Sequence, residues 1–150
     1  MENSEIEIRS AVESDAVRIA ELCLQLGYNA SPADVGRGIR QLADSRESAL
    51  FVAEEGGLVE GWIQVAQRSA IESGTFAEII GLVVDEAVRG RGVGAALVAE
   101  AEWWARAAGV SSLRVRTNVL RVKTHSFYAR MGFEETKKQI VFQKDLGSPG

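Results

Sequence analysis

The segment at residues 83–109, VVDEAVRGRGVGAALVAEAEWWARAAG, constrains the fold more than any other part of the chain. An apolar run leads into it, and residues 89–94 then hold three glycines and two arginines. An alanine-rich stretch with helical spacing follows. This order predicts a strand, a glycine-rich loop and a helix that begins at the loop.

The loop has the properties of a phosphate-binding site. The first N–H groups of a helix have no intrahelical acceptor and carry partial positive charge, so they bind anions. Glycine allows sharp turns and lets phosphate oxygens approach these N–H groups without a Cβ in the way. Arg89 and Arg91 add charge-assisted donors.

Two nucleotide motifs fit the loop less well. The pattern GxxxxGK[ST] is absent. GRGVGA at residues 90–95 satisfies a loose dinucleotide fingerprint, but the next strand ends in Thr117-Asn118, where an acidic residue is expected. Too little chain follows for the rest of a doubly wound sheet. A dinucleotide-dependent enzyme therefore stays open only as an alternative.

The other patterns indicate one mixed α/β domain over residues 1–150. Ser31 and Pro32 predict a helix start, and Gly56-Gly57 predicts a hairpin turn. The expected strands are 6–9, 49–55, 58–68, 75–84, 112–117 and 139–146. The expected helices are 14–26, 31–45, 94–109 and 122–132.

Composition narrows the class of protein. The chain is 46% hydrophobic and 25% charged, as in ordinary globular domains. Its single cysteine, Cys23, excludes an internal disulfide and fits a reducing compartment. The polar start is no secretory signal, and no apolar run is long enough for a membrane helix. We expect a cytoplasmic protein without a membrane partner and, with one histidine and one cysteine, without a metal.

The net charge of −4 is divided unequally along the chain. Residues 1–80 carry −8 and residues 81–150 carry +4. The acidic part would attract a cationic amine and argues against nucleic acid as a partner. Chance variation in solvated surface charge is the alternative interpretation.

The loop and one later segment together resemble the GNAT acetyltransferase superfamily. Motif A of that superfamily corresponds to Val84, four further residues, and R-x-x-G-x-G from Arg89 to Gly94. Motif B is similar to TNVLRVKTHSFYARMGF, in which Phe127-Tyr128 precedes Gly132-Phe133. The resemblance implies the GNAT fold, a mostly antiparallel sheet with splayed central strands flanked by helices. It also implies an acetyl-CoA-dependent N-acetyltransferase that moves acetyl to a primary amine of a small molecule or peptide by direct attack in a ternary complex.

The same resemblance implies which residues bind acetyl-CoA. The backbones of Leu82, Val83 and Val84 would pair with pantetheine like an added strand. Backbone N–H groups would hold the pyrophosphate, and the residues concerned are Arg89, Gly90, Arg91, Gly92, Val93, Gly94 and Ala95. Asn118 would contact the cofactor. Arg121 has either a phosphate contact or a role in starting the helix.

Catalysis requires a base for the amine, an oxyanion stabiliser and an acid for the leaving thiolate. Glu78 is the candidate base, because it stands eleven residues before Arg89, as in the histone-acetylating branch of the superfamily. On a regular strand it would share a face with Ile80 and Leu82. Other members carry a glutamate at the positions of Ile80 and Gly81, or use ordered water, and a solvated edge carboxylate is a further reading of Glu78.

Strand N–H groups near Leu82 would stabilise the oxyanion, and Tyr128 is the candidate acid, with a core aromatic as the alternative. His125 is expected to have a structural or helix-start role. Tyr28, Trp62 and Gln64 are candidates for the acceptor pocket. Homodimers are common in the superfamily, and we expect one here. A non-catalytic acyl-CoA sensor or interaction module with the same fold stays open.

Overall fold

The computed structural model describes residues 5–117 and 122–148, with only the main chain of Val122. The chain forms two compact units, Met1–Arg116 and Thr117–Gly150. The first unit contains a five-stranded sheet in the order β1-β2-β3-β4-β5. Its strands are β1 (Glu7–Ser10), β2 (Ser48–Glu55), β3 (Leu58–Ala70), β4 (Gly74–Val84) and β5 (Leu113–Val115). All neighbours are antiparallel except β4 and β5, so the expected mixed α/β class and mostly antiparallel sheet are confirmed.

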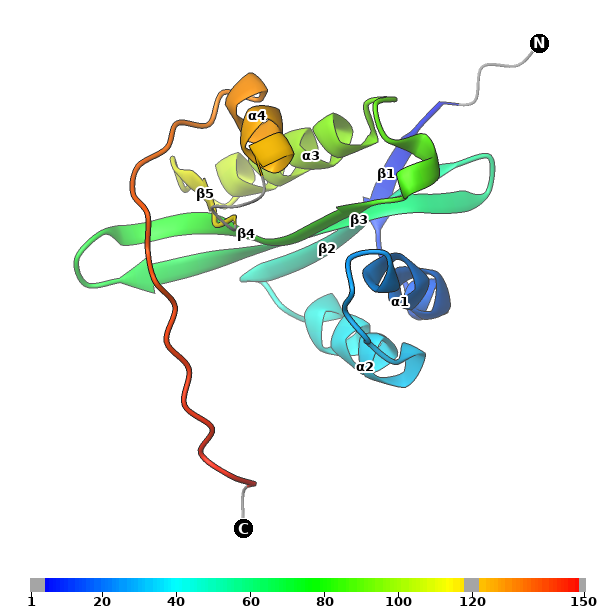
Figure 1. Ribbon diagram of the computed structural model, residues 1–150, viewed down its shortest axis with the longest axis horizontal. Helices are drawn as coiled ribbons and strands as arrows, with labels where there is room; N and C mark the ends of the chain where they lie inside the picture. Colours follow the sequence, from blue (N-terminus) through cyan, green and yellow to red (C-terminus); the bar gives the residue numbers. More distant parts are fainter. Residues whose placement is uncertain (1–4, 118–121, 149–150) are drawn as a thin grey trace. The chain divides into compact units, whose positions relative to one another are not determined.

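Helices cover both faces of this sheet (Figure 1). On one face lie α1 (Ala16–Leu24), preceded by the short η1 (Glu13–Asp15), and α2 (Pro32–Ala43); on the other lies α3 (Val93–Ala107), preceded by η2 (Glu86–Val88). Leu22 and Ile39 pack with Val52 and Val83 in the core under α1 and α2. Leu97, fully buried, belongs to the core under α3.

Local sequence signals explain where several elements begin and end. The Ser31 hydroxyl accepts a hydrogen bond from the Asp34 N–H at 3.1 Å, which caps α2. Gly56 and Gly57 have φ values of 59° and 83°, as a two-residue hairpin turn between β2 and β3 requires. Gly109 follows α3 with φ 82°. These predictions from the sequence are confirmed.

The second unit contains α4 (Val122–Arg130), which matches the helix expected at 122–132. The strand expected at residues 139–146 is wrong, because the structure forms no strand there. Ile140, Val141, Phe142 and Leu146 are more than 80% exposed. An apolar run needs a hydrogen-bonded neighbour to become a strand, and this segment joins no ladder in the described chain.

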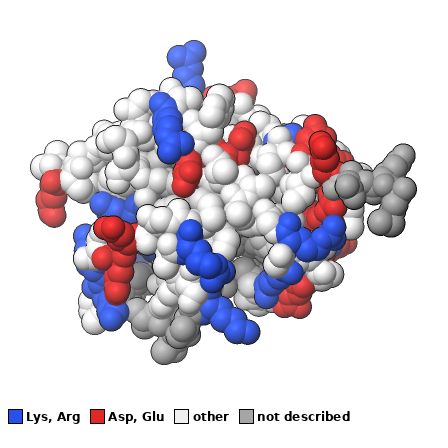
Figure 2. Space-filling model, turned by 90° about the horizontal axis from the view of Figure 1, so that it is seen from above, with Lys and Arg blue, Asp and Glu red and all other residues white. Residues whose placement is uncertain are grey.

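Charged side chains are intermixed on the face drawn in Figure 2, where Lys and Arg stand among Asp and Glu and are not gathered in one patch. None of the helices in the described ranges is long and apolar enough to cross a membrane.

Candidate active site

The strands β4 and β5 separate after a short parallel ladder. The ladder pairs Ala77 with Leu113 and ends at Ile79 with Val115. On its other side β4 pairs with β3 as far as Val84. Within the described residues no strand pairs with β4 beyond Ile79 on the β5 side, so residues 80–84 keep one open edge. This open edge lies where the family resemblance implies that the central strands splay apart.

A β-bulge marks the point of separation. Gln64 and Val65 are consecutive in β3, yet they pair with Gly81 and Ile79, so Ile80 is an extra residue in β4. The bulge reverses the alternation of side chains. Glu78 therefore faces the α1–α2 side of the sheet and Leu82 faces the α3 side. The expected common face for Glu78, Ile80 and Leu82 is wrong, because it assumed a regular strand.

Backbone alternation decides which groups face the open edge. The Asp85 N–H donates to the Glu60 carbonyl of β3 at 2.8 Å. Because backbone groups of a strand alternate in direction, Val83 also faces β3, whereas Leu82 and Val84 direct their N–H and C=O groups to the open edge. Of the three residues expected to pair with pantetheine, only Leu82 and Val84 direct their backbone groups to the edge that no strand of the described ranges occupies. Val83 instead contributes a buried side chain to the core.

The glycine-rich loop ends at the N-terminus of α3, as the sequence predicts. Gly90 and Gly92 have φ values of 86° and 88°, a left-handed conformation that favours glycine. Gly92 is the N-cap, and its carbonyl accepts the first helical bond, from the Ala96 N–H at 3.0 Å. The N–H groups of Val93, Gly94 and Ala95 lie in the first turn, where helical acceptors are missing. The Val93 side chain is buried, so only its backbone can serve an anion.

The two loop arginines differ in their surroundings. Arg89 is exposed. The Arg91 Nη2 donates to Glu55 Oε1 at 3.0 Å, so this guanidinium ties the loop to β2. Glu60 is buried next to this pair; its burial and then the neighbouring Glu55 raise its pKa, and the charge of Arg91 opposes that rise.

Glu78 is held between two arginines. Its side chain is only 10% exposed; Oε1 accepts from Arg68 Nε at 3.3 Å and Oε2 from Arg116 Nε at 2.7 Å. Each oxygen keeps a second lone pair, so the carboxylate can still accept a proton from an amine that reaches it. Neither partner could be predicted from the local sequence, because they lie ten and 38 residues away along the chain.

The indole ring of Trp62 packs over Gly81, the residue next to the bulge. Its ring atoms Cη2 and Cζ3 lie 2.8 and 2.9 Å from where a Cβ on Gly81 would sit. A side chain at position 81 would clash with the indole. The glutamate that other family members carry here therefore has no room in this chain. Of the other acceptor-pocket candidates, Tyr28 is exposed and Gln64 is half-buried.

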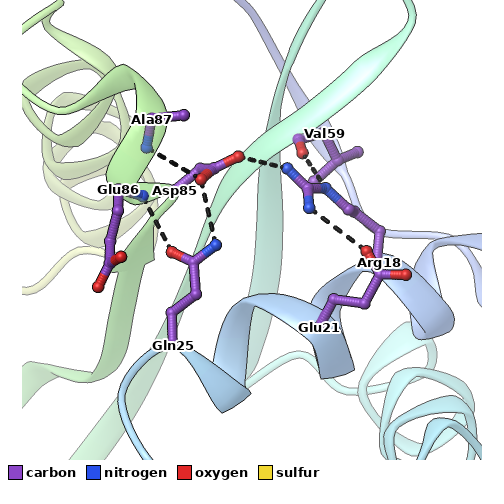
Figure 3. A network of polar contacts seen from close by, with 7 residues as sticks. All are labelled: Arg18, Glu21, Gln25, Val59, Asp85, Glu86 and Ala87. Atoms are coloured by element: carbon purple, nitrogen blue, oxygen red, sulfur yellow. Dashed lines mark hydrogen bonds and ion pairs between the residues drawn. The ribbon is translucent and has the colours of Figure 1, made fainter.

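A network that sequence reasoning missed lies beside the loop (Figure 3). Asp85 accepts hydrogen bonds from the side chains of Arg18 and Gln25 and from the Ala87 N–H. The Ala87 N–H bond first, and then Gln25, lower the pKa of Asp85. Nothing in the local sequence links residues 18 and 25 to residue 85.

In the second unit, Tyr128 stands on α4 between two aromatic rings. Its ring makes edge-on contacts with Phe127 and Phe133, at centroid distances of 5.1 and 5.4 Å. His125 lies on the same helix. The predicted cofactor residues Asn118 and Arg121 lie outside the described residues.

A comparison of the whole sequence with protein families decides the identity of this fold. Residues 15–133 match the Acetyltransferase (GNAT) family. The chain belongs to the GNAT family. It is an acetyl-CoA-dependent N-acetyltransferase that transfers an acetyl group to an amine. Both the sensor module and the dinucleotide-dependent enzyme are thereby disfavoured.

Similar proteins agree with this GNAT assignment. An aminoglycoside N(6′)-acetyltransferase type 1 from Stenotrophomonas maltophilia is 30% identical over 143 residues, covering 93% of both chains. A protein of the same name from Serratia marcescens is 29% identical, over 78% of this chain and 84% of its own. The solved aminoglycoside N-acetyltransferase AAC(6′)-Iy in complex with CoA has the same fold, with a TM-score of 0.86, 21% identity and coverage of 95% and 97%.

Acetyl-CoA is the acyl donor of this GNAT enzyme. The residues present fit such a donor, because an open strand edge lies beside a helix N-terminus that starts with glycine. In the part of the chain that the structure describes, no group of His, Cys, Asp and Glu side chains could hold a metal ion.

Proposed function

We propose that acetyl-CoA binds along the open edge of β4 and the N-terminus of α3. The unpaired edge at residues 80–84 carries this proposal, since it leaves the backbone groups of Leu82 and Val84 without a neighbouring strand. The backbone N–H groups of residues 89–95 would receive the pyrophosphate, except that of Arg91, which donates to the Val88 carbonyl at 3.3 Å. Asn118 and Arg121 would be further contacts. Together the two units would form one acetyltransferase domain, because the family match at 15–133 extends over both.

The acceptor is a cationic small-molecule amine, and the amino group of an aminoglycoside is the best candidate. Two relatives carry the name aminoglycoside N(6′)-acetyltransferase. Residues 1–80 carry a charge of −8 and contain α1 and α2. Tyr28, Trp62 and Gln64 would line the pocket. The net negative charge of this part would attract a polycationic amino sugar and disfavour nucleic acid.

The chemistry starts with the removal of a proton from the acceptor. An amine with a lysine-like pKa of about 10.4 costs roughly 4–5 kcal/mol to neutralise near pH 7. Glu78 would take this proton directly or through ordered water. The Leu82 N–H would stabilise the negative charge that develops on the acetyl oxygen, since it points to the open edge. Tyr128 would give its phenolic proton to the leaving thiolate.

Turnover with neamine tests this function. Wild-type protein with acetyl-CoA and neamine should release free thiol and yield neamine heavier by one acetyl group. Tyr128→Phe should lower kcat by about 100-fold, because the proton donor is lost. Phe127→Leu is the control, since it removes a ring contact and keeps the hydroxyl; it should lower Tm and keep kcat. No turnover of any aminoglycoside amine by protein that binds acetyl-CoA would refute the acceptor class.

We also propose that the enzyme works in the cytoplasm as a homodimer. The single, buried thiol of Cys23 suits a reducing compartment. The exposed apolar residues of segment 140–146 support a dimer, because such a segment gains burial by pairing with a second copy. Light scattering of the wild type should give twice the monomer mass, and Phe142→Asp should give the monomer. A monomeric wild type would refute the dimer.

A further inference from the structure

The network around Asp85 joins helix α1 to the segment that leads into the glycine-rich loop (Figure 3). Arg18 Nη2 donates to Asp85 Oδ2 at 2.6 Å, and Gln25 Nε2 donates to Asp85 Oδ1 at 3.1 Å. Arg18 Nε also donates to the Val59 carbonyl at 2.8 Å, which fixes the guanidinium against β3. The Arg18 guanidinium is thus held by two partners, one on β3 and one before the loop.

Gln25 makes a second contact on the same segment. Its Oε1 accepts a hydrogen bond from the Glu86 N–H at 2.9 Å. Asp85 Oδ1 accepts another from the Ala87 N–H at 3.1 Å. Both N–H groups belong to the first turn of η2, so they have no helical acceptors of their own. The side chains of Gln25, at the end of α1, and Asp85, at the end of β4, therefore accept hydrogen bonds from the first N–H groups of η2.

The loop depends on such support. A single 3₁₀ turn of three residues has little stability of its own, because few hydrogen bonds offset the ordering of its backbone. The glycines that follow lose more conformational freedom on ordering than other residues. An anion site made of backbone N–H groups binds well only where those groups are already ordered.

We propose that Arg18, Gln25 and Asp85 are positioning residues that order the start of the glycine-rich loop for the pyrophosphate of acetyl-CoA. The inference rests on the proposed function, in which this loop holds the pyrophosphate. None of the three needs to touch the donor. Asp85 stays ionised over the working pH range, since its N–H partners lower its pKa.

The test compares two acyl donors. Gln25→Ala removes both Gln25 hydrogen bonds at an exposed position, so the fold should persist. We expect CoA to bind about tenfold more weakly, equivalent to about 1.4 kcal/mol, in titration calorimetry. The kcat/KM for acetyl-CoA with neamine should fall equally. With S-acetyl-pantetheine, which keeps the thioester and lacks the pyrophosphate, the variant should match the wild type.

Two controls separate the outcomes. Gln41→Ala changes an exposed glutamine on α2 and should leave both donors unaffected. Asp85→Ala, which removes the centre of the network, should show the same donor difference as Gln25→Ala, to a larger extent. Equal losses with both donors, or no loss with either, would overturn the positioning role. Failure of the wild type to bind CoA would instead overturn the proposed site, and this inference with it.

Discussion

The two halves of β4 have the same kind of sequence and opposite surroundings. In the first half, residues 77–79 lie between β3 and β5, and the carboxylate of Glu78 is buried between Arg68 and Arg116. Residues 80–84 have β3 on one side only, and they lead through η2 into the glycine-rich loop. The first half resembles the interior of any sheet, whereas the second offers unsatisfied backbone groups.

One extra residue, Ile80, lies where the ladder with β5 ends. This bulge reverses the facing of every later side chain in β4. Glu78 therefore faces the α1–α2 side, where we propose that the acceptor binds. The Leu82 backbone faces the edge, where we propose that the donor binds. The proposed binding site thus includes a local irregularity in an otherwise ordinary strand.

The largest effect is expected in the glycine-rich loop, which follows the open half of β4 (residues 80–84). Gly92→Glu places a carboxylate where the pyrophosphate should bind, so CoA binding should be abolished in calorimetry. Gly57→Glu is the matched control, because Gly57 has φ 83° and open space around its Cβ position, like Gly92. Both variants should lose about 1–2 kcal/mol of stability. Equal CoA affinity in the two variants would contradict the assignment of the loop.

Proline substitutions should distinguish the two edges of the open half. Leu82→Pro removes an N–H that points away from β3, so the sheet should survive and kcat/KM should fall by about 300-fold through loss of the oxyanion donor. Val83→Pro removes an N–H that faces β3 and should destabilise the fold by about 1–3 kcal/mol. Thermal unfolding and turnover of both variants check this. The reverse pattern would mean that the direction of the backbone has been misassigned.

In the half of β4 that pairs with β5, Glu78→Gln tests whether the carboxylate held by the two arginines acts as a base. We expect kcat to fall by about 100-fold, because no side chain then accepts the proton. Glu72→Gln, at an exposed position just before β4, is the control. A Glu78→Gln variant that loses only thermal stability, with kcat unchanged, would show that Glu78 pairs with the arginines for stability and that water is the base.

The smallest effect is expected on thermal stability, at Glu60, which lies on β3 beside the open half of β4. Burial and Glu55 raise the pKa of Glu60, so the folded state holds its proton more tightly than the unfolded state. The stability tied to this proton is lost as pH rises through the raised pKa. Glu60→Gln should therefore raise Tm by about 2–4 °C near pH 7. Near pH 4, where both states are largely protonated, Tm should be unchanged; a gain of equal size there would contradict the role of charge.

The sequence predicted features that depend on neighbouring residues. The glycine-rich loop, the Ser31 cap and the Gly56-Gly57 turn all rest on short-range backbone preferences, and the structure contains each of them. The bulge at Ile80 could not be predicted, because FAEIIGLVV is a nearly continuous apolar run in which no change of period marks an extra residue. The ion pairs of Glu78 and the hydrogen bonds of Asp85 join residues that are far apart in sequence. The strand at 139–146 was wrongly predicted, since an apolar pattern does not supply a partner.

The most direct test of the open edge is hydrogen exchange of single β4 amides by NMR, with and without CoA. The N–H groups of Leu82 and Val84 should exchange quickly in the free protein and become protected when CoA is bound. The Val83 N–H, which faces β3, should be protected in both states. If CoA binds and leaves the exchange at Leu82 and Val84 unchanged, the donor does not pair with the open half of β4, and this account of the site is wrong.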